Sequence, residues 1–163
     1  MLAGTILAEA AMEDGLHVVQ TQTYGPEARL GASKSEVVIS THEIAYPEVD
    51  EPDLVLCFSR DAYLKYGQEV AANGVVLLEE TIAQEIPDAV GNLVPFRRTA
   101  HDLGNDMSLN VIALGALVAL TGAVSRDSLR NGLKHRMKPE FLALNEKALE
   151  EGFKLGEAVA AKS

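Results

Sequence analysis

The sequence predicts an α/β fold in three layers, with a mainly parallel β-sheet flanked by helices. Two uninterrupted apolar runs, at residues 54–58 and 75–78, are typical of strands that are buried on both faces of a parallel sheet. Segments with helical periodicity follow both runs, as in alternating β and α units. The chain has 163 residues, of which 47% are hydrophobic and 23% charged, so we expect residues 1–163 to form a single domain.

The first forty residues are expected to form a helix, a strand, a loop and a second strand. Residues 1–14 carry small and apolar side chains on one helical face, and Gly15 is suited to cap the C-terminus of this helix. Residues 16–19 are β-prone. Residues 21–35 combine glycine, proline and many hydroxyl groups, which indicates a structured loop, and residues 36–40 form the next strand.

The middle of the chain holds the predicted parallel sheet. After a shorter strand candidate at 44–46, the first apolar run leads into a predicted helix at 61–72. The second apolar run follows, and residues 94–96 are a weaker strand candidate. From about residue 99 onward the pattern is helical. A parallel α/β unit normally opens with a strand, whereas this chain opens with a helix.

The uncharged stretch at residues 107–125 is near the ~20 residues that a membrane span needs. Its small and polar residues dilute the hydrophobicity, so we interpret it as a helix buried on nearly all sides and expect no membrane span. Gly115, Ala119 and Gly122 fall on one face and would let another helix approach closely, within the domain or across a subunit contact. A last helix is predicted to start at Pro139.

The charge and the cysteine content exclude several classes of function. Lys and Arg total 14 against 24 Asp and Glu, and the net charge of −10 disfavours a nucleic-acid partner. Cys57 is the only cysteine, so the chain forms no internal disulfide and holds no cysteine-ligated cluster. Its apolar surroundings indicate a buried thiol, and the four scattered histidines predict no metal site. A reducing, cytoplasmic setting is expected.

Two polar segments carry the candidate chemistry. Ser59, Arg60 and Asp61 follow the central strand, where open α/β sheets bind ligands, but Ser59 or Asp61 could equally just cap the next helix. The loop at 21–36 concentrates hydroxyl groups and charged side chains between two strands, as functional loops do. No nucleophile elbow, dinucleotide fingerprint or phosphate-binding loop motif is present.

This loop resembles the gamma subunit, or gamma domain, of 2-oxoacid:ferredoxin oxidoreductases, and most closely the 2-oxoglutarate type. The resemblance rests on QTQTYGPEAR at residues 20–29 and GASKSEV at 31–37. It extends over nearly the whole chain through five shorter stretches: residues 46–49, 52–56, 103–105, 110–116 and 145–152.

The resemblance implies a non-catalytic subunit of a thiamine-dependent complex. Such complexes convert a 2-oxoacid and coenzyme A to acyl-CoA and CO2, and pass two electrons to ferredoxin. Thiamine diphosphate, Mg²⁺ and iron–sulfur clusters then belong to partner subunits, namely alpha, beta and a small ferredoxin-like subunit. This chain would pack on the thiamine-carrying subunits, shape the coenzyme A and active-site entrance, and be inactive alone.

The same resemblance implies the residues that contact a ligand or a partner subunit. Tyr24, Gly25 and Pro26 would shape the loop, while Glu27 and Arg29 would hydrogen-bond to a partner or ligand or form a salt bridge within the loop. Arg29 with Lys34 could meet a phosphate. The full set of expected contact residues is Tyr24, Gly25, Pro26, Glu27, Arg29, Ser33, Lys34, Ser59, Asn105 and Asn110.

The sequence departs from the family pattern at two places. The family has two glycines where this chain has Leu30-Gly31, and it begins with a strand and a Gly-Gly-Gln-Gly turn that are absent here. A misplaced start site, truncation and real loss are open explanations. Two alternatives to the complex subunit remain open: a stand-alone regulatory α/β domain that binds a small molecule, and a truncated scaffolding fragment.

Overall fold

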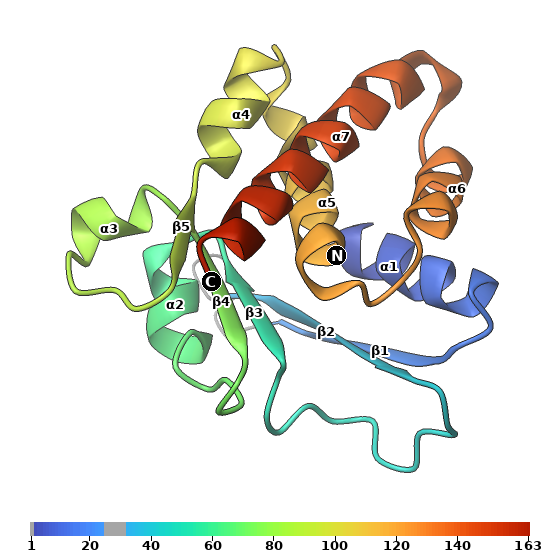
Figure 1. Ribbon diagram of the computed structural model, residues 1–163, viewed down its shortest axis with the longest axis horizontal. Coiled ribbons are helices and arrows are strands. Elements are labelled where there is room, and N and C mark those ends of the chain that lie inside the picture. The colour runs from blue at the N-terminus through green and yellow to red at the C-terminus, as the bar shows by residue number, and fades with distance from the viewer. Residues whose placement is uncertain (1, 25–31) are drawn as a thin grey trace.

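The computed structural model of the chain describes residues 2–24 and 32–163. It has an α/β architecture in which helices cover a small parallel sheet, and a separate hairpin packs beside it (Figure 1). In chain order the elements are α1 (Leu2–Glu13), β1 (His17–Thr23), β2 (Lys34–Ser40), β3 (Leu54–Cys57), α2 (Arg60–Tyr66), β4 (Val75–Glu79), α3 (Ile82–Glu85), β5 (Asn92–Val94), α4 (Phe96–Asp102), the 3-10 helix η1 (Asp106–Ser108), α5 (Leu109–Thr121), α6 (Arg126–Arg136) and α7 (Pro139–Ala161).

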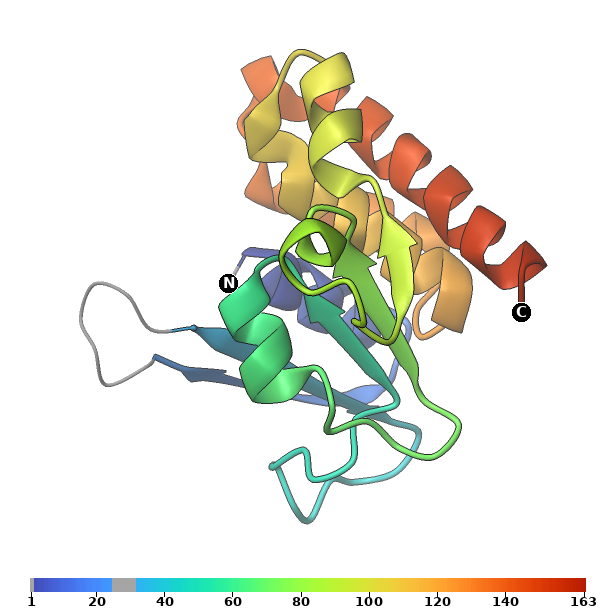
Figure 2. The ribbon, with the colours of Figure 1, turned by 90° about the vertical axis from the view of Figure 1, so that its left-hand side faces the viewer.

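The parallel sheet has the strand order β3-β4-β5 and is covered on both faces, as the two apolar runs predict. Side chains alternate between the faces along each strand. Leu54, Leu56 and Leu77 pack into the main core with α5 and α7, whereas Cys57 and Leu78 pack into a second cluster with α2 and α3. Figure 2 shows the sheet between these two sets of helices, which makes three layers.

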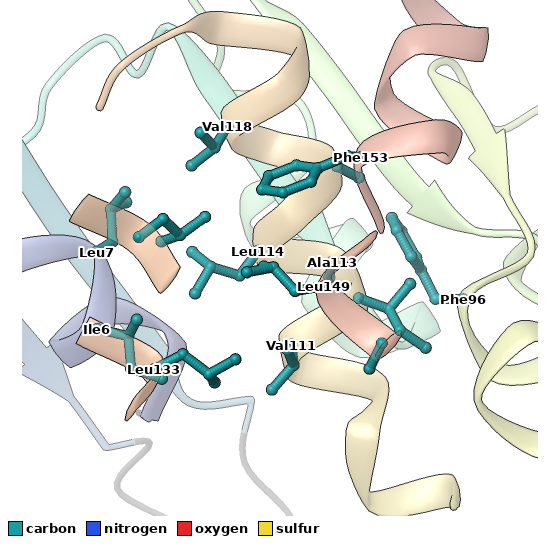
Figure 3. Packing of buried hydrophobic residues seen from close by; sticks show 14 of the residues in the cluster. Ile6, Leu7, Phe96, Val111, Ala113, Leu114, Val118, Leu133, Leu149 and Phe153 are labelled. Atoms are coloured by element: carbon teal, nitrogen blue, oxygen red, sulfur yellow. The ribbon is translucent and has the colours of Figure 1, made fainter. Parts of the chain in front are cut away.

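The main core is built around α5, which is buried on nearly all sides (Figure 3). Its contact with α7 is unusually close, because a Cβ on Gly152 would lie 2.1 Å from the carbonyl oxygen of Ile112. A Cβ on Gly115 would lie 2.5 Å from the carbonyl oxygen of Leu149. The predicted close approach therefore occurs within this chain, and no described helix is long and apolar enough to span a membrane.

Gly122 does not belong to this contact. It has a φ of 62° and ends α5 by donating its N–H to the carbonyl oxygen of Val118, and a Cβ added there would meet no atom within 4 Å. Gly15, with a φ of 76°, ends α1 in the same left-handed conformation, as its position in the sequence predicts.

Several element boundaries predicted from the sequence are wrong in the first half of the chain. Residues 21–23 and 34–35 are strand rather than loop, because Thr21, Gln22 and Thr23 pair across the hairpin with residues 34–36. Residues 44–46 find no partner strand and are irregular. Residues 21–23 become a strand only through pairing with residues 34–36, whereas residues 44–46 have no such pairing. Local composition alone does not determine which segment finds a partner strand.

Two later boundaries also differ. The helix predicted at 61–72 ends at Tyr66, where Gly67 donates its N–H to the carbonyl oxygen of Tyr63. A Cβ on residue 67 would lie 2.4 Å from the Tyr63 ring, so only glycine fits at this turn. The strand predicted at 94–96 lies at Asn92–Val94, since Pro95 ends β5 and α4 begins directly after it.

Candidate functional site

The carboxyl edge of the parallel sheet brings together side chains from all three strand ends. Ser59 follows β3, Glu79 is the last residue of β4, and Arg97 lies just after β5. The Arg97 backbone N–H donates to Oε2 of Glu79 at 3.0 Å, and its Nη2 donates to the carbonyl oxygen of Phe58 at 3.1 Å. This edge is where ligands of open α/β sheets bind, so it is the first candidate region.

Ser59 has a structural role in this arrangement. Its Oγ accepts a hydrogen bond from the backbone N–H of Ala62 at 3.2 Å, so Ser59 is the N-cap of α2. The capping role that the sequence suggested is therefore present. A ligand contact by the exposed Ser59 hydroxyl stays a prediction.

Glu79 and Arg97 are functional candidates that the sequence reasoning missed. Glu79 has no exposed surface, and its Oε1 has no hydrogen-bond partner in the described part of the chain. Arg97 is exposed. A signal for Glu79 was present, since an acidic side chain ends an apolar run that is buried on both faces. Nothing comparable marked Arg97, whose contacts come from two other strand ends.

The end of the hairpin at the Thr23–Lys34 pair is the second candidate region. Nζ of Lys34 lies 2.8 Å from Oε1 of Glu36 and 5.3 Å from the centre of the Tyr66 ring. Tyr66 in turn lies with its Oη 3.5 Å from the carbonyl oxygen of Ala32. The hydrogen bond to Glu36 raises the pKa of Lys34, and burial of the ammonium opposes this rise. Lys34 is therefore charged and already paired, so a phosphate would compete with Glu36 for it.

The other predicted loop residues lie directly beyond the Thr23–Lys34 pair or outside the described residues. Tyr24 is 65% exposed, and its Oη donates to Oε1 of Gln22 at 3.2 Å. Ser33 is exposed. The remaining four predicted contacts fall outside the described residues: Gly25, Pro26, Glu27 and Arg29.

Asn105 and Asn110 are not part of either region. Asn105 caps η1, because its Oδ1 accepts from the backbone N–H of Met107 at 3.1 Å and its Nδ2 donates to Oγ of Ser108 at 2.9 Å. Asn110 is exposed in the first turn of α5. The structure thus shows a local capping role for Asn105, and the predicted ligand or partner contacts of both residues stay predictions.

The described residues offer little to a metal ion or to thiol chemistry. Among residues 2–24 and 32–163, no three His, Cys, Asp or Glu side chains gather as a metal site would require. Cys57 is 1% exposed, and burial raises the pKa of its thiol to about 11. Because the thiolate is the reactive form, this thiol is inert at neutral pH.

A surface groove along α7 is separate from both candidate regions. Its walls carry mixed charges that are largely paired with one another. Arg130 binds Glu150 at 2.7 Å, and Lys154 binds Glu151 at 2.5 Å. Exposed pairs of this kind are common on solvated helix faces, so the groove does not add to the candidate chemistry.

Comparison with known proteins identifies relatives over the length of the chain. Residues 1–155 match the family described as pyruvate ferredoxin/flavodoxin oxidoreductase. The 2-oxoglutarate synthase subunit KorC of Methanocaldococcus jannaschii is 39% identical, over 95% of this chain and 86% of its own length. KorC of Methanothermobacter marburgensis is 40% identical, over 95% and 89%. The ketoisovalerate oxidoreductase subunit VorA of Methanothermobacter thermautotrophicus is 32% identical, over 91% of this chain and 32% of its own.

Two solved structures share the fold with a TM-score of 0.83 each. One is the keto/oxoacid ferredoxin oxidoreductase gamma subunit of Geobacter sulfurreducens, which is 38% identical and covers 96% of this chain and 90% of that one. The other is the 2-oxoglutarate:ferredoxin oxidoreductase of Magnetococcus marinus with 2-oxoglutarate, coenzyme A and succinyl-CoA bound. It is 26% identical and covers 96% of this chain and 28% of that chain.

Proposed function

The chain belongs to the pyruvate ferredoxin/flavodoxin oxidoreductase family, and from this membership we propose how it works as the gamma subunit of a 2-oxoacid:ferredoxin oxidoreductase. The complex oxidatively decarboxylates a 2-oxoacid, transfers the acyl group to coenzyme A, and passes two electrons to ferredoxin in the cytoplasm. Residues 1–163 act in it as one gamma-type domain. The stand-alone regulatory domain and the scaffolding fragment are not favoured, because the relatives are subunits of oxidoreductases.

The 2-oxoacid of this complex is 2-oxoglutarate. The observation that carries this step is the identity of 39–40% to 2-oxoglutarate synthase subunits over 95% of the chain. The ketoisovalerate enzyme subunit reaches 32%. The likeness to the Magnetococcus enzyme, which was solved with 2-oxoglutarate and coenzyme A, supports the same substrate and coenzyme A as the acyl acceptor.

The redox cofactors lie in partner subunits rather than in this chain. A single buried cysteine with a raised thiol pKa does not fit an iron–sulfur cluster, which needs several thiolate ligands. We place thiamine diphosphate, Mg²⁺ and the clusters in the alpha, beta and ferredoxin-like subunits. The chemistry that they supply when bound is decarboxylation and electron transfer, and this chain contributes the surface on which those subunits and coenzyme A dock.

The end of the hairpin at the Thr23–Lys34 pair is the proposed docking surface toward coenzyme A and the active-site entrance. Tyr24 and Ser33 are exposed there, and Lys34 is fixed beside them by Glu36 and Tyr66. A long antiparallel ladder from His17 to Thr23 supports this end rigidly. Exposed polar side chains on a rigid support are typical of recognition surfaces.

The test is purification of the affinity-tagged chain from its own cells under anaerobic conditions. We expect larger subunits to co-purify and to contain thiamine diphosphate and iron. The purified complex should reduce ferredoxin only when both 2-oxoglutarate and coenzyme A are present. A chain that arrives alone, or a complex that prefers 2-oxoisovalerate or pyruvate, would contradict the proposal.

A further inference from the structure

Arg97 differs from the other arginines of the described residues because its guanidinium has no acidic partner. Within residues 2–24 and 32–163, each remaining arginine lies within ion-pair distance of a carboxylate. These pairs are Arg60–Asp61, Arg98–Glu80, Arg126–Glu157, Arg130–Glu150 and Arg136–Glu9. Arg97 has no ion pair and is exposed. On a protein with a net charge of −10, an arginine without a carboxylate partner is an unusual feature.

Hydrogen bonds hold both the backbone and the guanidinium of Arg97 in place. Its backbone N–H is bound by Oε2 of Glu79 at 3.0 Å, and its Nη2 is bound to the carbonyl oxygen of Phe58 at 3.1 Å. The ring of Phe58, whose carbonyl oxygen Arg97 binds, packs edge to face with the ring of Phe96, with 6.0 Å between their centres. A guanidinium has five N–H donors, and the bond to the Phe58 carbonyl oxygen uses one of them. The other donors can bind a partner, and this bond fixes their direction.

Glu79 provides an independent observation. Burying a carboxyl group costs folding free energy when one of its oxygens is left unpaired, and among the described residues only Oε2 of Glu79 has a partner. An apolar residue at the end of β4 would stabilise the fold without this cost. The buried acid is explained if its task is to fix the backbone of Arg97 and the first turn of α4.

We propose that Arg97 binds a carboxylate on the surface of the thiamine-carrying subunit against which this chain packs. This inference rests on the proposed function. A planar guanidinium binds a carboxylate with two parallel hydrogen bonds, and arginines of this kind dominate the energetics of many protein interfaces. The local charge favours one carboxylate over a phosphate, because Arg60 and Arg98 are already paired with carboxylates, which leaves Arg97 as the single unpaired guanidinium among these three.

The exposed setting of Arg97 favours a protein partner over a small molecule. Small ligands bind in concave pockets that bury most of their surface, whereas Arg97 is exposed. Arg97 instead projects from the first turn of α4 at the rim of the sheet, beside the end of β3. An opposing carboxylate could reach it without entering a cavity.

The test compares Arg97 with its neighbour Arg98, which is on the same helix and also exposed but is paired with Glu80. Tagged chains carrying R97A, R97E, R98A or R98E are expressed in the native cells, and the co-purified partner is quantified at rising salt. We expect R97A to lower partner recovery by about 10-fold and R97E further, while R98A and R98E stay within about twofold of wild type. Equal recovery for all variants, or equal loss, would overturn the inference.

A conservative variant keeps the test decisive if R97A and R97E fold poorly. Arg97→Lys retains the charge, and its new amine can be coupled to a neighbouring carboxylate by a carbodiimide in the intact complex. We expect a cross-link from position 97 to an Asp or Glu of the partner, and no such cross-link from the Arg98→Lys complex. Absence of the cross-link in an assembled complex would refute this inference but leave the proposed function standing. A wild-type chain that recruits no partner would instead refute the proposed function and this inference with it.

Discussion

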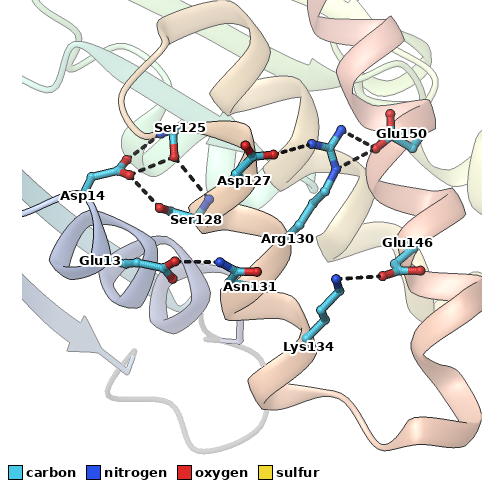
Figure 4. A network of polar contacts seen from close by, with 10 residues as sticks. All are labelled: Glu13, Asp14, Ser125, Asp127, Ser128, Arg130, Asn131, Lys134, Glu146 and Glu150. Atoms are coloured by element: carbon cyan, nitrogen blue, oxygen red, sulfur yellow. Dashed lines mark hydrogen bonds and ion pairs between the residues drawn. The ribbon is translucent and has the colours of Figure 1, made fainter.

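The helical side of the molecule and the carboxyl edge of its sheet use their polar groups in opposite ways. On the helical side, Asp14 at the end of α1 accepts hydrogen bonds from Ser125 and Ser128, and Arg130 joins α6 to Glu150 of α7 (Figure 4). At the sheet edge, the Arg97 guanidinium has no acidic partner among the residues that the structure describes. Polar groups that face one another within a chain stabilise the fold, whereas a fixed group that faces outward is available to a partner.

The two regions also differ in how tightly they are packed. The contact between α5 and α7 brings backbone against backbone through Gly115, Gly152 and Gly156. At the sheet edge, by contrast, Glu79 has an oxygen without a partner. The close helix contact stabilises the fold, whereas the incompletely bonded buried carboxyl group at the sheet edge costs folding free energy.

The largest expected loss of stability comes from adding a side-chain carbon at the close contact between α5 and α7. In Gly152→Ala, the new Cβ would lie 2.1 Å from the carbonyl oxygen of Ile112 and 3.0 Å from Cα of Gly115, and backbone atoms cannot yield as side chains do. We expect the free energy of unfolding to fall by about 3 kcal/mol. Urea unfolding followed by circular dichroism measures this change.

Gly132 of α6 is the matched control. A Cβ there would lie 3.2 Å from the carbonyl oxygen of Ile6, which a small shift relieves. Alanine also has a higher helix propensity than glycine, by about 1 kcal/mol. Gly132→Ala should therefore change the unfolding free energy by less than about 1 kcal/mol. If both variants lose stability equally, the close α5–α7 contact is not what distinguishes Gly152.

Sequence patterns sufficed where a structure depends on local periodicity or on a single residue type. The buried strands at Leu54–Cys57 and Val75–Glu79, the cap at Gly15 and the buried helix α5 all follow from such patterns. The hairpin did not, because Thr21–Thr23 become strand only through pairing with residues 34–36. Hydroxyl-rich segments suit a loop or a strand edge equally well until the partner is known.

The candidate site could be predicted only where a residue's place follows from local sequence. Ser59 follows a strand directly, so its place at the sheet edge could be read from the sequence. The importance of Arg97 could not, since its contacts with Phe58 and Glu79 join residues 39 and 18 positions apart. An arginine also looks identical in sequence whether or not a carboxylate lies beside it in space.

A smaller effect is expected from the polar contact between α1 and α6. Hydrogen bonds from the Ser128 side chain, and then from the backbone and side chain of Ser125, hold the pKa of Asp14 below its usual value. Asp14→Asn should lower the unfolding free energy at pH 7 by about 1.5 kcal/mol, because hydrogen bonds to a charged group are lost and water replaces only some of them. The measurement is again urea unfolding.

The pH dependence checks that the charge of Asp14 is responsible. A carboxyl whose pKa is lowered by folding stabilises the protein above its unfolded pKa of about 4, and this stabilisation is lost as the pH falls through the folded pKa. The difference between wild type and Asp14→Asn should therefore shrink below about pH 4. Asp106→Asn is the control, since this carboxylate is 80% exposed and lies 3.6 Å from His101. A difference that persists unchanged at pH 3 would contradict the assignment.

The smallest expected effect lies at the sheet edge and separates the two roles of Ser59. Ser59→Ala removes the hydroxyl that accepts from the N–H of Ala62, which should cost about 0.5–1 kcal/mol of unfolding free energy. Ser59→Thr keeps a capping oxygen and should stay within a few tenths of wild type. If capping is the whole role, both variants assemble and turn over 2-oxoglutarate normally at temperatures well below unfolding. Lost activity in Ser59→Ala with intact assembly would instead assign the hydroxyl to a ligand, and the sheet edge would then bind with more than Arg97.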